Sequence, residues 1–285
     1  MKLLTYVRAG TVRHGRLADG DKVVELGDGD LAALLEKAET PADGPAYALS
    51  DVDIVAPLLR PGKLLAVAAN YQEHVTEAGA APLVKKTLAP RLFLKPPTAI
   101  IGPGDAITLP EVSSQVDWEA ELAVVIGRRA KDVDVSAALD IVAGYAVSND
   151  VSARSMDYGY ERESGDAAVG FFDWLAGKWL DGFAPMGPYL VTADEVPDPQ
   201  DLPIELRVND VVRQRGSTAQ MIFSVAELVA FASRLMTLEP GDVLLTGTPS
   251  GVGVASGDFL AAGDEIAISI GGLGVLTNKV VGRGR

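Results

Sequence analysis

Short apolar runs separated by Gly, Pro or Asp recur along most of the chain. From residue 63 onward these runs dominate, and apolar runs with helical spacing are rare between them. This arrangement indicates a large, partly closed, barrel-like β-structure rather than a βαβ repeat. We therefore predict an α+β protein that is mostly β. The nine predicted strands cover residues 63–70, 91–96, 118–127, 141–150, 187–193, 204–210, 242–248, 265–270 and 275–281.

One helix is clearly marked in the second half of the chain, over residues 224–236. Ser224 and Glu227 form an S-x-x-E capping box at its start. Apolar residues that would face the core follow at helical spacing, namely Val225, Leu228, Val229 and Ala232.

The first 60 residues differ from the rest and predict a small N-terminal α+β subdomain. Three short strands are expected at 3–8, 12–17 and 22–26, followed by an amphipathic helix over 30–38. A segment rich in Pro, Gly and Asp then leads to the main domain, for which we expect residues 61–285.

The charge balance restricts the partners. The formal net charge is −14, and no basic run resembles a surface for a phosphate backbone, so nucleic acid is not expected as a partner. An anionic substrate would be repelled at long range. Such a substrate therefore needs a local positive site, supplied by a bound cation or by Lys and Arg.

The chain has no cysteine, which excludes disulfides, thiolate nucleophiles and Cys-ligated metals. It shows no signal peptide and no run of 18 apolar residues, so neither a membrane partner nor export is expected, and a cytoplasmic location is predicted. The Gly-rich segment 246–253 (TGTPSGVG) lacks the G-K-[ST] of a phosphate loop. We interpret it as a turn where backbone passes close to another group.

Acidic side chains interrupt two of the apolar strands. Glu119 and Glu121 alternate onto one face of the strand 118–127, and Asp150 ends the strand 141–150. Unpaired buried carboxylates would each cost several kcal/mol, so Arg, Lys or a metal should lie beside them. A solvent-facing strand is the alternative. As metal ligands, the three carboxylates suit Mg²⁺, Mn²⁺ or Ca²⁺ and disfavour zinc.

Only two histidines are present. His74 precedes Glu77 by three residues, a spacing at which Glu77 could orient the imidazole on one helical turn and raise its basicity. An exposed polar turn is the alternative. We interpret His14 as a surface residue.

A set of ordered motifs resembles the fumarylacetoacetate hydrolase family. The resemblance runs from about residue 60 to the C-terminus, and the preceding segment resembles the small subdomain of the longer bacterial members. The motifs are NYQEH with Glu77, FLKPPTAIIGPGD, DWEAELAVVIG, NDVSAR, GKWLDGFAPMGPYLV, MIFSVAEL, LEPGDVLLTGTPSGVG and GGLGVLTNKV.

The resemblance implies a mixed β-roll fold, a homodimer, and a metal held by Glu119, Glu121 and Asp150. It also implies that His74 and Glu77 form a dyad on a mobile lid. Contacts with the substrate or the developing oxyanion are implied for Lys178 and Arg154, and positions near the pocket for Lys95, Gln214 and Thr248.

Asp157 departs from the family pattern, which often places a glutamine there. An ionised carboxylate cannot donate a hydrogen bond, so the oxyanion site or the substrate should differ from that of the namesake enzyme. In one interpretation Asp157 accepts a hydrogen bond from a substrate hydroxyl. In the other it forms an ion pair at the surface.

The expected activity follows from the resemblance. We expect hydrolysis of a C–C bond in an acylpyruvate or a 2,4-diketo sugar acid through a metal-stabilised pyruvate enolate, with Mg²⁺ or Mn²⁺ as cofactor and a small 2-keto acid as substrate. A decarboxylase of the oxaloacetate type and an isomerase of 2-hydroxy-diene-dioates are alternatives on the same scaffold. A non-catalytic metal- or ligand-binding protein is the alternative from another class.

Overall fold

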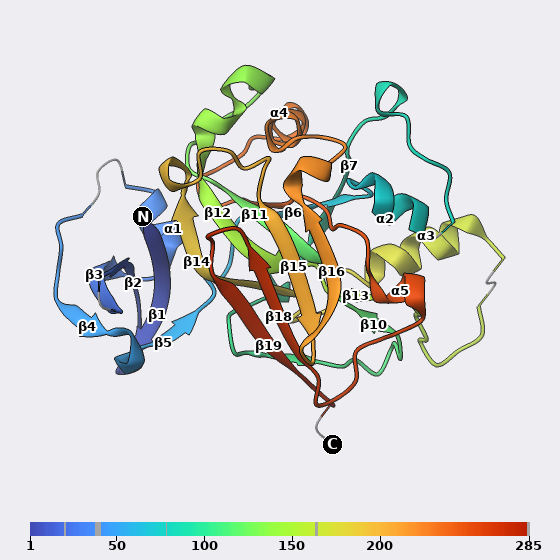
Figure 1. The fold of residues 1–285 in the computed structure, drawn as a ribbon, viewed down its shortest axis with the longest axis horizontal. Coiled ribbons are helices and arrows are strands. Elements are labelled where there is room, and N and C mark those ends of the chain that lie inside the picture. The colour runs from blue at the N-terminus through green and yellow to red at the C-terminus, as the bar shows by residue number, and fades with distance from the viewer. Residues whose placement is uncertain (20, 38–40, 78, 163–164, 284–285) are drawn as a thin grey trace.

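The computed structural model describes residues 1–19, 21–37, 41–77, 79–162 and 165–283, and most of its regular structure is strand (Figure 1). The strands are β1 Lys2–Arg8, β2 Thr11–Ala18, β3 Lys22–Asp28, β4 Ala46–Ala48, β5 Asp53–Val55, β6 Leu64–Ala68, β7 Arg91–Lys95, β8 Ile100–Ile101, β9 Ala106–Thr108, β10 Val116–Asp117, β11 Ala120–Ile126, β12 Val142–Asn149, β13 Ser152–Ala153, β14 Ala184–Thr192, β15 Pro203–Val208, β16 Val211–Ser217, β17 Val243–Leu245, β18 Glu265–Ile270 and β19 Val275–Val281. The α-helices are α1 Leu31–Leu35, α2 Gln72–Glu77, α3 Ala167–Ala176, α4 Val225–Leu235 and α5 Gly253–Ser256.

Two large sheets form the body of the protein. The larger has the path β4-β3-β2-β1-β14-β12-β11-β17-β6-β7, and the smaller has the order β16-β15-β18-β19-β9. Apolar side chains of β11, β12, β15 and β18 share one core cluster, which packs the smaller sheet onto the larger one. Within the described residues no sheet closes into a barrel, and the predicted mostly-β, α+β class is confirmed.

The N-terminal strands extend the larger sheet instead of forming a separate one. β1 pairs with β14 through Lys2 and Leu3, and β2 and β3 continue the sheet outward, to the left in Figure 1. A small apolar cluster around Leu4 and Tyr6 lies within this part. The domain division at residue 60 stays a prediction.

Two details of the N-terminal part differ from the sequence interpretation. Helix α1 is shorter than predicted: Asp30 caps it by accepting the N–H of Ala32, and Ala38 lies outside the described residues. The surface interpretation of His14 is wrong. The residue is fully buried in β2, between the paired strands β1 and β3, and burial lowers the pKa of its imidazole.

The predicted helix of the second half is confirmed as α4, including its capping box between Ser224 and Glu227. Helix α3 and strand β16 were not predicted. A two-residue turn, Asn209-Asp210, with both φ angles positive, joins β15 to β16, and this is the signal that could have revealed the hairpin. In the described part of the chain, no helix is long and apolar enough to span a membrane.

Replacing Ser224 by Ala removes the side chain that accepts the N–H of Glu227 at the start of α4. We expect the free energy of unfolding to fall by about 1 kcal/mol, the usual cost of a lost N-cap. Chemical denaturation measures this. Ser136→Ala, at an exposed position whose side chain has no hydrogen bond among the described residues, is the control and should change the value little.

Candidate metal and substrate site

A cavity of about 440 Å³ opens where β6 and β12 end, where β7 and β11 begin, and where helices α2 and α3 approach them. This size is typical of small-molecule sites. Its lining combines acids, bases and aromatic rings: Glu119, Glu121, Asp150, His74, Arg91, Arg154, Lys178, Phe93, Phe171 and Trp174.

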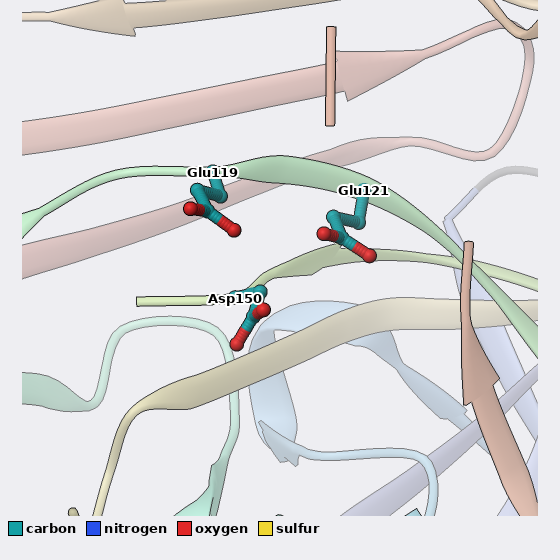
Figure 2. A group of neighbouring side chains, drawn as sticks. All are labelled: Glu119, Glu121 and Asp150. Atoms are coloured by element: carbon teal, nitrogen blue, oxygen red, sulfur yellow. The ribbon is translucent and has the colours of Figure 1, made fainter. Parts of the chain in front are cut away.

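Three carboxylates converge in this cavity (Figure 2). Strands β11 and β12 are antiparallel, with Ala120 opposite Asn149, so Glu119 and Asp150 lie side by side where the two strands end. The N–H of Asp150 donates to the carbonyl of Glu119 (2.9 Å). Side-chain oxygens of Glu119, Glu121 and Asp150 lie within 4.8 Å of one another, and all three residues are buried.

Two of the three carboxylates already have cationic partners. Lys178 Nζ lies 2.7 Å from Glu119 Oε2 and 2.6 Å from Asp150 Oδ2, and Lys95 Nζ lies 2.5 Å from Asp150 Oδ1. Arg154 adds a second ion pair to Glu119. Burial alone would raise the pKa of Glu119, but Lys178 and Arg154, with His74, outweigh burial and hold that pKa below its usual range. Glu119 is therefore ionised.

Glu121 is different, because no cationic side chain among the described residues contacts its carboxylate. Its one hydrogen bond comes from the backbone N–H of Gly247, 2.7 Å from Oε2. Burial, then the charges of Asp150 and Glu119, raise the pKa of Glu121 well above its usual range. A buried carboxylate that has a backbone N–H as its partner and a raised pKa indicates that one positive charge is missing beside it.

A fourth buried acid, Asp117, was not singled out in the sequence, although the two-residue period of a strand places it with Glu119 and Glu121. Its carboxylate accepts from Arg154 and from the N–H groups of Gly253 and Val254. It thereby holds Arg154 in place beside Glu119.

The charges in this region do not balance among the side chains. Of the four buried carboxylates, with Asp117 included, three form ion pairs with the cations Lys95, Arg154 and Lys178, and among the described residues Arg91, which also lines the cavity, contacts none of them. One negative charge remains, and it falls on Glu121. Carboxylate oxygens are hard ligands, so a divalent cation such as Mg²⁺ or Mn²⁺ fits the group that Glu119, Glu121 and Asp150 form.

The predicted dyad is present in the geometry. His74 Nδ1 lies 2.7 Å from Glu77 Oε1 on α2, and His74 lines the same cavity as the carboxylates. The N–H of Gly251 donates to the other oxygen of Glu77 (2.7 Å). The Gly-rich segment therefore contacts both parts of the site, through Gly247 and through Gly251.

Three residues that the resemblance places near the pocket lie at different depths. Thr248 lines the cavity, whereas Lys95 lies behind it against Asp150. Gln214 is fully buried and does not line the cavity. Its amide accepts from the N–H of Ala120 and donates to the hydroxyl of Thr248, so it connects β11 to the Gly-rich segment.

Asp157 lies outside the cavity. Its side chain accepts the N–H of Gly159 (2.8 Å), two residues along the chain. The structure does not bring it together with Arg154 and Lys178, which line the cavity. This placement favours neither of its two interpretations: Asp157 has no ion pair among the described residues, and its contact with a substrate hydroxyl stays a prediction.

An aromatic wall that the sequence analysis did not anticipate closes one side of the cavity. The Phe93 and Trp174 rings meet edge to face, with centroids 5.1 Å apart, and Phe171 stacks on Trp174. Lys178 Nζ lies over both Phe93 and Trp174. Apolar rings beside the charged groups keep water away and strengthen the ion pairs.

Comparison with known proteins gives consistent matches. Residues 63–281 match the profile described as fumarylacetoacetate (FAA) hydrolase C-terminal. The Homo sapiens protein named oxaloacetate tautomerase FAHD2A, mitochondrial, is 43% identical over 258 residues, which are 90% of this chain and 78% of the relative.

Solved structures agree over the whole length. The fumarylacetoacetate hydrolase from psychrophilic Exiguobacterium antarcticum has a TM-score of 0.84 at 34% identity, and 5-carboxymethyl-2-hydroxymuconate delta-isomerase from Mycobacterium smegmatis has 0.80 at 37%. Maleylpyruvate hydrolase from Sphingobium has 0.76 at 29%. Each match covers 99% of this chain and 100% of the other.

The unbalanced charge at Glu121 predicts opposite effects of two neutral substitutions in metal-free protein. Glu121→Gln replaces a carboxyl that has no cationic partner among the described residues and whose raised pKa favours its neutral form, so it should leave the melting temperature unchanged or raise it. Asp150→Asn removes the partner of Lys95 and Lys178 and should cost about 3–5 kcal/mol, as broken buried ion pairs do. Thermal unfolding in EDTA measures both.

Adding Mn²⁺ extends this test. The wild-type melting temperature should rise with the metal concentration, because a ligand that binds only the folded state stabilises it. Glu121→Gln should lose most of that rise. A drop for Glu121→Gln in EDTA as large as that for Asp150→Asn would show that Glu121 has a cationic partner and needs no metal.

Proposed function

The chain belongs to the fumarylacetoacetate hydrolase family, and from this premise we propose that it is a divalent-metal-dependent enzyme that moves a proton at the carbon next to the keto group of a small 2-keto acid. The product is the other tautomer, keto or enol. One observation carries the proposal: His74, which is hydrogen-bonded to Glu77, lines the same cavity as the carboxylates that lack one positive charge.

The metal site fits this chemistry. Glu119, Glu121 and Asp150 would hold Mg²⁺ or Mn²⁺, which when bound supplies positive charge to a keto oxygen as that oxygen becomes negative. Lys178 and Arg154 lie against the same carboxylates and line the cavity, so their N–H groups are available to a substrate carboxylate or oxyanion there.

His74 is suited to be the base. His74 Nδ1 lies within hydrogen-bond distance of Glu77, and in the neutral tautomer that donates this hydrogen bond from Nδ1, Nε2 is the atom that takes a proton from the substrate. Gly251 holds the second oxygen of Glu77, which fixes the orientation of the pair. The imidazolium that forms is stabilised by the Glu77 carboxylate and returns the proton at the other site of the tautomer.

The relatives favour tautomerisation over C–C hydrolysis. Curated relatives at 41–43% identity are named oxaloacetate tautomerases. Structures named hydrolases match at 29–34% identity, and two Burkholderia relatives at 42% identity carry only the name putative hydrolase, which states neither a substrate nor a bond. Hydrolysis of an acylpyruvate or a 2,4-diketo sugar acid, which the sequence led us to expect, is the second candidate, because the same His74 could take its proton from water. The names of these relatives give less support to the other two alternatives, decarboxylation of a keto diacid and non-catalytic binding of a metal or ligand.

We also propose that the protein is a homodimer. Aromatic side chains of α3 and its flanks are exposed, with Phe171 56%, Phe172 61% and Trp179 44% accessible. Apolar surface of this kind commonly marks an interface, and a second copy is the occupant that the family resemblance implies. The cytoplasmic location and the exclusion of nucleic-acid and membrane partners stay predictions.

The proposed reaction is tested with oxaloacetate and an acylpyruvate, each with Mg²⁺, with Mn²⁺ and with EDTA. We expect the ultraviolet absorbance of the oxaloacetate enol to decay faster with enzyme and metal, and neither compound to yield more pyruvate than the same mixture without enzyme. Enzyme-dependent formation of pyruvate from the acylpyruvate would indicate hydrolysis and contradict tautomerisation as the activity. Pyruvate from oxaloacetate would indicate decarboxylation, and no reaction on either compound would contradict an enzymatic role on these compounds.

The base is tested with His74→Ala and Glu77→Gln. Each should lower kcat by about 10²–10⁴-fold, the usual share of a positioned general base, while the affinity for Mn²⁺ measured by calorimetry stays nearly unchanged. Glu73→Gln is the matched control. Glu73 is exposed on the same helix, and its carboxylate accepts one long hydrogen bond from Ser250 Oγ (3.4 Å), so this variant should keep its activity. An equal loss of Mn²⁺ affinity would identify His74 as a metal ligand instead.

A further inference from the structure

Arg91 differs from the other cations that line the cavity. Lys178 and Arg154 each contact buried carboxylates there. The Arg91 guanidinium forms neither an ion pair nor a hydrogen bond with any of the residues that the structure describes, although it also lines the cavity. Its positive charge is therefore available to a ligand.

Strand β7 connects Arg91 to the carboxylates. Alternate residues of a strand project from the same face, so Arg91, Phe93 and Lys95 form one row. Lys95 is buried at the inner end and contacts Asp150, Phe93 belongs to the aromatic wall, and Arg91 is exposed at the outer end. At about 3.3 Å per residue, the Cα atoms of Arg91 and Lys95 lie about 13 Å apart. The row thus runs from the buried charges, past an apolar ring, to a free cation.

The row gives the cavity two charged ends. The net charge of −14 repels anions, so a cation with no partner among the described residues is well placed to attract one. Arginine binds carboxylates with two parallel N–H···O bonds, which also orients the ligand. The ring of Phe93 suits the carbon atoms that join the two ends of such a ligand.

We propose that Arg91 is a specificity-determining residue that binds a second carboxylate, at the far end of a dicarboxylic 2-keto acid whose keto-acid end lies at Glu119, Glu121 and Asp150. This inference rests on the proposed function, which places a 2-keto acid in the cavity. Arg91 selects the substrate and takes no part in the proton transfer.

The test compares two pairs of 2-keto acids in which the far group is either a carboxylate or a methyl group. The pairs are 2-ketoglutarate with 2-ketovalerate and 2-ketoadipate with 2-ketocaproate. Binding is measured by calorimetry on the Mn²⁺-loaded wild type, on Arg91→Met and on Arg60→Met. Arg60 is also exposed and forms no ion pair among the described residues, but it does not line the cavity, so its variant is the matched control.

In at least one pair, the wild type should bind the dicarboxylate about tenfold or more tightly than its methyl partner, since a charge-assisted hydrogen bond is worth about one to two factors of ten. Arg91→Met should remove that preference and leave the affinity for the methyl compounds unchanged. Arg60→Met should keep it. For a compound that is turned over, Arg91→Met should raise KM and change kcat little.

The outcomes separate the two proposals. If the wild type binds both members of each pair equally, or if Arg91→Met keeps the preference, the role of Arg91 is wrong and the proposed function stands. If the wild type binds none of the four compounds and also fails to act on oxaloacetate and the acylpyruvate, the proposed function fails and the inference fails with it. A preference without any turnover would support Arg91 as a binding residue and contradict the catalytic proposal.

Discussion

The burial of more negative than positive charge at the ends of β11 and β12 is the constraint on which the site depends. Removing a carboxylate from water costs several kcal/mol unless a positive charge compensates it. The fold supplies Lys95, Lys178 and Arg154 from three separate segments, and these compensate Asp117, Glu119 and Asp150. Glu121 keeps only a backbone N–H. The protein therefore retains a carboxylate whose charge is unfavourable until a cation binds beside it.

The Gly-rich segment links this constraint to the chemistry of α2. Gly247 donates to Glu121, and Gly251 donates to Glu77, so one turn contacts both the metal ligands and the base. Glycine is required at both positions. A Cβ at Gly251 would lie 2.1 Å from the carbonyl oxygen of Arg213, and one at Gly247 would lie 2.8 Å from Asn70 Cβ, with positive φ angles at both. The sequence interpretation of a turn where backbone passes close to another group describes this segment correctly.

Much of the site could be predicted because its signals are local. The alternation of Glu119 and Glu121, the place of Asp150 at a strand end and the spacing of His74 and Glu77 are all visible within a few residues, and the structure brings these side chains together around one cavity. The partners of the acids could not be predicted in the same way. Lys178 is 59 residues from Glu119 and Lys95 is 55 residues from Asp150, so only the folded chain shows the pairing.

Some features of the fold could not be predicted, because the local sequence pattern there is ambiguous. Helix α3 is apolar on several faces and shows no clear core-facing stripe, because its aromatic residues contribute to the cavity wall and to exposed surface. His14 is polar by type, but β2 lies between two paired strands, and this tertiary position decides its burial. Arg91 at a strand start is unremarkable in the sequence, and its lack of a partner among the described residues emerges only from the folded cavity.

The central claim is that Glu119, Glu121 and Asp150 bind one divalent cation, and a crystal structure of protein grown with Mn²⁺ tests it most directly. The anomalous difference map should show one strong peak within about 2.0–2.6 Å of an oxygen from each carboxylate, the range for hard cations with oxygen ligands. A map without a peak at this position, with Lys178 still bridging Glu119 and Asp150, would contradict the account.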